Sequence, residues 1–191
     1  ISQLFVAFHD QHPDIKFHIH SGDADIVLGR LDKGLVDMGL MLGPVRQEKY
    51  DYLKLPQRDI FGLLMPKDSP LAAQASIKIN QLKSLPLIFA EQTFYGQQPA
   101  DWFGADYSTM NIVGTYNLVY NATFMVEQGI GYALCLDKLV NTSGRNLAFR
   151  PITPELSVSL HIVTKKFQTF SPAVRVFLEQ LKGVIAEYSS C

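Results

Sequence analysis

Apolar residues open the chain at helical spacing, at Ile1, Leu4, Phe5 and Phe8. Residues three and four apart share one face of an α-helix, so this spacing predicts a helix with one buried face. Residues 15–20 then alternate strictly between apolar and polar side chains, which is the period of a β-strand. The start of the chain therefore predicts a helix followed by an edge strand with one apolar face.

A second helix and a buried strand follow. Asp23 can accept a hydrogen bond at a helix N-terminus, and the apolar residues after it fall along one stripe as far as Leu35. Gly34 is placed to end this helix, because glycine adopts the left-handed backbone without strain. Residues 38–42 form a continuous apolar run that stops at Gly43, which is typical of a parallel strand buried on both faces.

Strand-like and helix-like segments alternate through the rest of the chain, which favours an α/β fold with mixed, mostly parallel sheets. A long amphipathic helix is expected after Ser171, which precedes a proline suited to the first helical position. Short helical turns are expected at 77–82, with Asn80 as a cap, and at 137–140. The other predicted elements are strands at 52–55, 60–65, 85–90, 112–113, 130–136, 147–151 and 157–164, and a helix at 118–128 that ends at Gly129.

Composition narrows the functional classes. The 191 residues are 47% hydrophobic and 18% charged, which is enough apolar material for a large core. The formal net charge is −1 and the basic residues are not clustered, so direct nucleic-acid binding by this chain is not expected. No apolar run reaches the roughly 18 residues that a membrane span needs. Cys135 and Cys191 form no disulfide framework, which favours a reducing cytoplasm.

Several segments match a known family in order and spacing. The longest are Leu31–Asp37, Met65–Ala72 and Val126–Leu134. Together they resemble the effector-binding domain of LysR-type transcriptional regulators, and the match covers nearly the whole chain. The resemblance implies two Rossmann-like α/β lobes, similar to type II periplasmic binding proteins, joined by two crossover strands. We expect the first lobe from residues 1–80 and 152–191, and the second from residues 81–151.

The chain also departs from the family pattern. The family's first strand and its DNA-binding helix-turn-helix are expected to lie upstream of this sequence. Ala24 stands where the family often has Ser or Thr at a helix start, and the missing hydroxyl weakens the case for a carboxylate effector. Ser69 replaces a common His, and the segment Cys135, Leu136 and Asp137 stands where the family frequently has Leu-Pro after a strand.

The resemblance implies a sensor domain and not an enzyme. A small-molecule effector would bind between the lobes, a homodimer or homotetramer would transmit the signal, and DNA would be bound only through the missing N-terminal domain. No membrane partner is expected. One hypothesis packs the first helix and residues 15–20 of one subunit antiparallel against the helix 118–128 of another. Two alternatives stay open: a stand-alone two-lobed solute-binding protein of a transporter, and a small-molecule lyase or dehydratase.

Candidate ligand contacts follow from the strand ends, because ligands of doubly wound α/β sheets bind outside the carboxyl ends of the strands. Exposed amides at the start of the helix 118–128 can also hold an anion or a carbonyl. Asn117 is either the cap of that helix or a ligand contact, and residues 92–93 are either ligand contacts or a surface loop. The predicted ligand-binding residues are Leu42, Gly43, Pro44, Gln92, Thr93, Tyr95, Tyr116, Asn117 and Leu136.

No pattern in the sequence supports catalysis or a metal site. The nucleophile elbow, the phosphate-binding loop, the dinucleotide fingerprint and the Cys-x-x-Cys pair are all lacking. His18 and His20 share a strand face with Lys16, which favours a solvated edge or a dimer contact over metal ligation. Cys135 lies in an apolar strand and is expected to be a buried, unreactive thiol. The sequence therefore predicts no catalytic residue, metal or cofactor.

Overall fold

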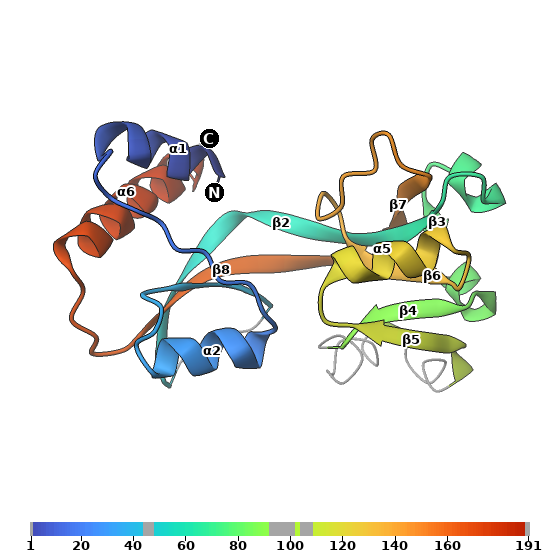
Figure 1. Ribbon diagram of the computed structural model, residues 1–191, viewed down its shortest axis with the longest axis horizontal. Coiled ribbons are helices and arrows are strands. Elements are labelled where there is room, and N and C mark those ends of the chain that lie inside the picture. Colours follow the sequence, from blue (N-terminus) through green and yellow to red (C-terminus); the bar gives the residue numbers. More distant parts are fainter. Residues whose placement is uncertain (1, 44–47, 92–101, 104–108, 190–191) are drawn as a thin grey trace. The chain divides into compact units, whose positions relative to one another are not determined.

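The computed structural model describes residues 2–43, 48–91, 102–103 and 109–189 (Figure 1). Helices and strands alternate along the chain, as the hydrophobic pattern predicted. In order, the elements are α1 (Ser2–Gln11), α2 (Ala24–Asp32), β1 (Gly39–Leu42), β2 (Tyr50–Pro66), η1 (Pro70–Ala73), β3 (Ile77–Lys78), η2 (Ile79–Ser84), β4 (Leu87–Ala90), β5 (Ile112–Tyr116), α5 (Val119–Glu127), β6 (Tyr132–Leu136), β7 (Leu147–Thr153), β8 (Ser157–Lys165) and α6 (Pro172–Ser189).

The chain folds into two compact units, one of residues 1–58 with 159–191 and one of residues 59–158. It passes from one unit to the other within β2 and within β8, so these two strands are the predicted crossovers. The second lobe predicted from the sequence, residues 81–151, is shorter at both ends. The hydrophobic pattern marks where strands lie, but it does not reveal that one long strand contributes to both units.

Local sequence signals set the ends of the helices in the first unit. The Oδ1 atom of Asp23 accepts the N–H of Ile26 at 2.8 Å and caps α2 as predicted. Gly34 has φ +67°, and the next N–H, that of Leu35, donates to the carbonyl of Arg30 at 2.9 Å. At the start of α6, the N–H of Val174 donates to the Oγ of Ser171 at 3.3 Å. The predicted caps are confirmed at all three places.

The core of the first unit forms where α1 and α6 pack on the strands β2 and β8. Phe8 is 1% exposed and its ring makes an edge contact with that of Phe177, with centroids 5.1 Å apart. Both predicted amphipathic helices are thereby confirmed, since their apolar faces are the buried ones. The buried members of this cluster are Leu4, Phe8, Leu55, Leu160, Ile162, Phe177, Leu178 and Leu181.

Two strand predictions for the first unit are wrong. Residues 15–20 form no strand, and Ile19 is 76% exposed although Phe17 contacts the aromatic core. Alternation supplies an apolar face, but a strand also needs a neighbouring backbone to pair with. Strand β1 was predicted as a parallel strand buried on both faces. It pairs antiparallel with β8, and its outer side chains Leu40 and Leu42 are 48% and 44% exposed.

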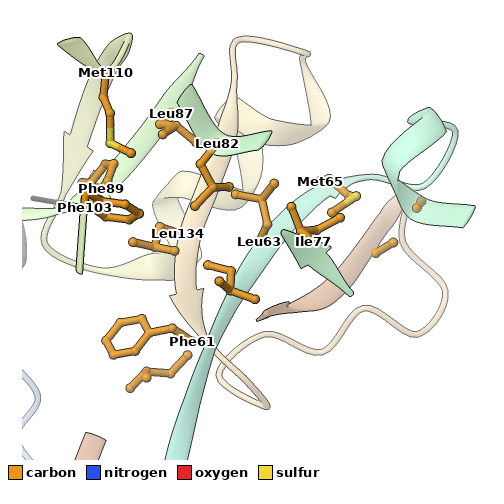
Figure 2. Packing of buried hydrophobic residues seen from close by; sticks show 14 of the residues in the cluster. Phe61, Leu63, Met65, Ile77, Leu82, Leu87, Phe89, Phe103, Met110 and Leu134 are labelled. Carbon is orange, nitrogen blue, oxygen red and sulfur yellow. The ribbon is translucent and has the colours of Figure 1, made fainter. Parts of the chain in front are cut away.

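The second unit is a sheet with a core on each face. Strand β4 pairs in parallel with β5 and β6, whereas β2 runs antiparallel to β6 and β7. Side chains of β6 alternate, so Leu134 enters one core cluster and Cys135 the other. Figure 2 shows Leu63, Leu82 and Leu134 lying together within the first cluster. The strand order β1-β8-β2-β6-β4-β5 makes the sheet mixed, and the predicted α/β fold class is confirmed.

Three predicted local details differ from the structure. Residues 137–140 form a turn instead of a helix, with Lys138 at φ +64°. Lys78, and not Asn80, occupies the N-cap position of η2. Leu118, and not Asn117, occupies that of α5. Within the residues that the structure describes, no helix is long and apolar enough to cross a membrane.

Candidate functional site

Three predicted ligand residues lie at one edge of the sheet in the unit 59–158. Strands β4, β5 and β6 are parallel neighbours, with Ala90 opposite Tyr116 and Ile88 opposite Ala133. Their carboxyl ends therefore meet at the same edge, where Tyr116 ends β5 and Leu136 ends β6. Asn117 follows directly and is exposed to solvent. This edge is the arrangement from which parallel α/β sheets bind ligands.

The other predicted ligand residues divide into two groups. Leu42 and Gly43 lie at the carboxyl end of β1 in the first unit, where Gly43 has φ +78° and its N–H donates to the carbonyl of Ser159 at 2.9 Å. They belong to a different unit from Tyr116, Asn117 and Leu136. Pro44, Gln92, Thr93 and Tyr95 lie outside the described residues.

Tyr116 holds the sheet edge together through its hydroxyl. The hydroxyl donates a 2.7 Å hydrogen bond to the carbonyl of Leu134, although β4 lies between β5 and β6 in the strand order. The side chain therefore reaches across β4. Burial raises the pKa of Tyr116 above its ordinary value, and the nearby Cys135 thiol adds to the increase. The hydroxyl proton of Tyr116 is therefore used by the fold and is not available to donate to a ligand.

A pocket of about 310 Å³ opens beside Leu136, at the carboxyl end of β6. The sequence reasoning missed it because residues 137–140 were predicted as a helical turn. The signal that was available is the run of turn-forming residues at 141–144. In this run the side-chain oxygen of Asn141 accepts the N–H of Ser143 at 3.0 Å. The pocket is lined by Leu64, Cys135, Leu136, Asp137, Lys138, Val140, Asn141, Thr142, Ser143 and Phe149.

Cys135 is a buried thiol, as predicted. Its side chain is 2% exposed, and burial raises the pKa of Cys135 to about 12, with a further contribution from the charge of Asp137. The thiol is therefore neutral near physiological pH and a poor nucleophile.

His161 is a buried polar residue that the sequence reasoning did not single out. It lies on β8 opposite Met41 and is 9% exposed, with its ring 5.4 Å from that of Tyr52 in an edge contact. Burial lowers the pKa of His161, the charge of Lys54 lowers it further, and a backbone hydrogen bond to Gly43 acts in the opposite direction. Among the described residues, its Nδ1 atom has no hydrogen-bond partner. A neutral imidazole thus sits next to the predicted ligand residue Gly43.

The described residues offer no group of three or more His, Cys, Asp or Glu side chains that could hold a metal ion. His18 and His20 are exposed on the segment that was expected to be a strand. They belong to the first unit, whereas Tyr116 and the pocket belong to the unit 59–158.

Comparison with known proteins assigns the family. The family model of the LysR substrate binding domain matches residues 1–186. The chain belongs to this family. The resemblance inferred from residues 31–37, 65–72 and 126–134 is therefore confirmed.

Relatives of the domain are transcriptional regulators. The Hca operon transcriptional activator HcaR of Escherichia coli is 28% identical over 165 residues, which cover 82% of this chain and 55% of HcaR. The chain spans 55–64% of the length of the curated relatives that it matches. The alternatives of a transporter protein and of a lyase gain no support from these relatives.

Solved structures share the fold. The regulatory domain of CcmR from Synechocystis, solved in complex with 2-PG, has a TM-score of 0.79 at 15% identity and covers 96% of this chain and 90% of its own. The effector binding domain of QuiR, solved in complex with shikimate, has a TM-score of 0.78 at 17% identity and covers 93% of this chain and 86% of its own. This LysR domain therefore has the architecture of known effector-binding domains.

Proposed function

We propose that this chain is the effector-binding and dimerisation domain of a LysR-type transcriptional regulator of the cytoplasm. A small metabolite binds between the two units and favours one arrangement of them, and the change in population alters DNA binding by a domain outside this chain. The observation that carries the proposal is the shared edge of Tyr116, Asn117 and Leu136 within a LysR substrate binding domain. The domain acts as a sensor and performs no catalysis.

The effector we propose is a small polar or weakly charged molecule. Asn117 offers amide groups at the sheet edge, and His161 offers a neutral imidazole beside Gly43 in the other unit. Ala24 lacks the hydroxyl that would help to hold a carboxylate at the start of α2. Two neighbours of the same fold were solved with small molecules, which supports a small-molecule effector here.

A thermal-shift screen against a metabolite library tests this proposal. A ligand that binds only the folded state raises the melting temperature with concentration, by mass action. We expect a dose-dependent hit whose shift is reduced by Asn117→Ala. The matched control is Asn80→Ala, which removes an amide that is also exposed, from η2. A hit with equal shifts in both variants would argue against Asn117 as a contact.

The proposed dimer pairs two exposed apolar faces. Helix α5 exposes Tyr120 and Phe124 by 57% and 50%, and Val6 of α1 and Ile19 are 62% and 76% exposed. Exposed apolar surface of this kind is typical of an interface. We propose that α1 and residues 15–20 of one subunit pack antiparallel on α5 of another. In this dimer, residues 15–20 contact the second chain, and they need not pair with another strand of their own chain.

Substitution of exposed residues separates this dimer from simple unfolding. Phe8 is unsuitable as a probe, because it is 1% exposed and belongs to the core of the first unit. We expect Ile19→Glu and Phe124→Glu each to shift the chain from dimer to monomer in size-exclusion chromatography with light scattering. Val176→Glu, at a 45% exposed position of α6, serves as the control and should leave the dimer intact. Dimers that persist in both test variants would refute this interface.

A further inference from the structure

The pocket at the carboxyl end of β6 belongs to the unit 59–158 alone. Each of its lining residues comes from β2, β6, β7 or the segment 137–143, and each falls within that unit. Its volume of about 310 Å³ is at the lower limit of sites that bind small organic molecules. The pocket is therefore complete without the first unit, unlike the effector site proposed above.

The inner wall of this pocket is apolar and uncharged. Leu64 is fully buried and Cys135 nearly so, and Val140 and Phe149 are half-buried beside them. The thiol of Cys135 stays protonated near neutral pH, because burial raises its pKa to about 12. Val140 and Phe149, the partly exposed members of this wall, can receive an apolar side chain, which gains free energy by leaving water.

The rim of the pocket carries one charge of each sign. Asp137 and Lys138 are consecutive, and the left-handed backbone of Lys138 at φ +64° is rare for a residue with a side chain. A further carboxylate, Asp59, interacts electrostatically with both of them. Thr142 adds a hydroxyl. The side-chain oxygen of Asn141 accepts the N–H of Ser143, and its two amide N–H groups can donate to a ligand.

We propose that this pocket binds a zwitterionic amino acid with an apolar side chain, as a second ligand besides the interlobe effector, whose proposed edge has only Leu136 in common with the pocket lining. The ammonium group lies toward Asp137, where Asp59 adds negative potential. The carboxylate lies toward Lys138 and the donors of Asn141 and Thr142. The apolar side chain lies on Val140 and Phe149, which are the partly exposed apolar residues of the wall. An amino acid offers a partner to both Asp137 and Lys138, whereas a singly charged molecule leaves one of these two side chains partly desolvated without a partner.

Isothermal titration calorimetry of the chain with L-phenylalanine and L-leucine tests the proposal. Phenylacetate and phenethylamine, which each lack one of the two charges, are the comparison ligands. We expect one-to-one binding of an amino acid, at least tenfold tighter than binding of either singly charged analogue. Asp137→Asn and Lys138→Gln should each weaken that binding at least tenfold. Asp68→Asn and Lys67→Gln, at exposed positions of another turn, are the matched controls and should not change it.

A filling variant locates the bound molecule. Thr142→Phe places a larger side chain at a half-buried position of the pocket, and binding should be lost while the melting temperature stays close to that of the parent. If the Thr142→Phe variant unfolds, the binding measurements on Asp137→Asn and Lys138→Gln test the proposal without it. Absence of binding up to millimolar amino acid would overturn the proposal. Binding that none of the three variants weakens would place the molecule elsewhere. If phenylacetate or phenethylamine bound as tightly as the amino acid, the proposed selection of a zwitterion would be refuted.

Discussion

At the scale of single residues, alanine substitutions at two glycines should change the free energy of unfolding in opposite directions, because the surroundings of the two glycines differ. A Cβ atom at Gly62 on β2 would overlap the ring of Phe149 and lie 2.5 Å from the carbonyl oxygen of Arg150, whereas one at Gly183 on α6 meets nothing within 4 Å. We expect Gly62→Ala to lower the free energy of unfolding by about 1–3 kcal/mol. Gly183→Ala should raise it by about 0.5–1 kcal/mol, because glycine loses more entropy in a helix. Urea denaturation measures both, and changes of the same sign would contradict this packing.

His161 makes the stability of the domain depend on pH. Burial lowers the pKa of His161 in the folded state, so the unfolded chain binds the proton more readily. The stability that this residue confers is therefore complete above the unfolded pKa of about 6.5, and it is lost as the pH falls toward the lower folded pKa. We expect His161→Gln to flatten the loss of stability between about pH 7 and pH 5, measured by urea denaturation at several pH values. A His161→Gln variant that keeps the slope of the parent chain would contradict this role of His161.

At the scale of elements, the sequence predicted helices better than strand partners. The cap at Asp23, the left-handed Gly34 and Gly129 and the proline start after Ser171 are signals that act within a few residues, and the structure has all of them. Strand pairing depends on residues far apart in the chain. Residues 15–20 have the right period but no partner strand, and β1 has a partner of the opposite direction from the one expected.

The candidate site also has features that the sequence predicts locally and features that depend on strand pairing or on turn geometry. Strand ends are visible in the sequence, so Tyr116, Asn117 and Leu136 could be predicted to lie near one another. Asn117 was predicted as either the cap of α5 or a ligand contact, and Leu118 occupies the N-cap position instead. The hydrogen bond from Tyr116 to Leu134 depends on the order of three strands, and that order is a property of the folded sheet. The pocket beside Leu136 depends on turn geometry at Lys138, for which the sequence carries only the weak signal of turn-forming residues.

At the scale of the whole molecule, the two units share two strands. The chain crosses between units at residues 58–59 and 158–159, within β2 and β8. A ligand that contacts both units changes the stability of each, whereas a ligand that contacts one unit acts first on that unit. The proposed effector and the proposed amino acid are therefore expected to protect different sets of backbone amides from exchange.

Hydrogen exchange with mass spectrometry separates the two proposals. The effector found in the thermal-shift screen should slow exchange at both the end of β1, around residues 42–43, and the start of α5, around residues 117–121, because its site requires both units. L-phenylalanine should slow exchange mainly at residues 134–143, which surround the pocket. An effector that protects only residues 117–121 would show that the second unit binds it alone, and the mechanism of a shift between arrangements of the two units would then fail. Since a buried effector must exclude water from the backbone at each strand end that it touches, the pattern of protected amides reports the site directly.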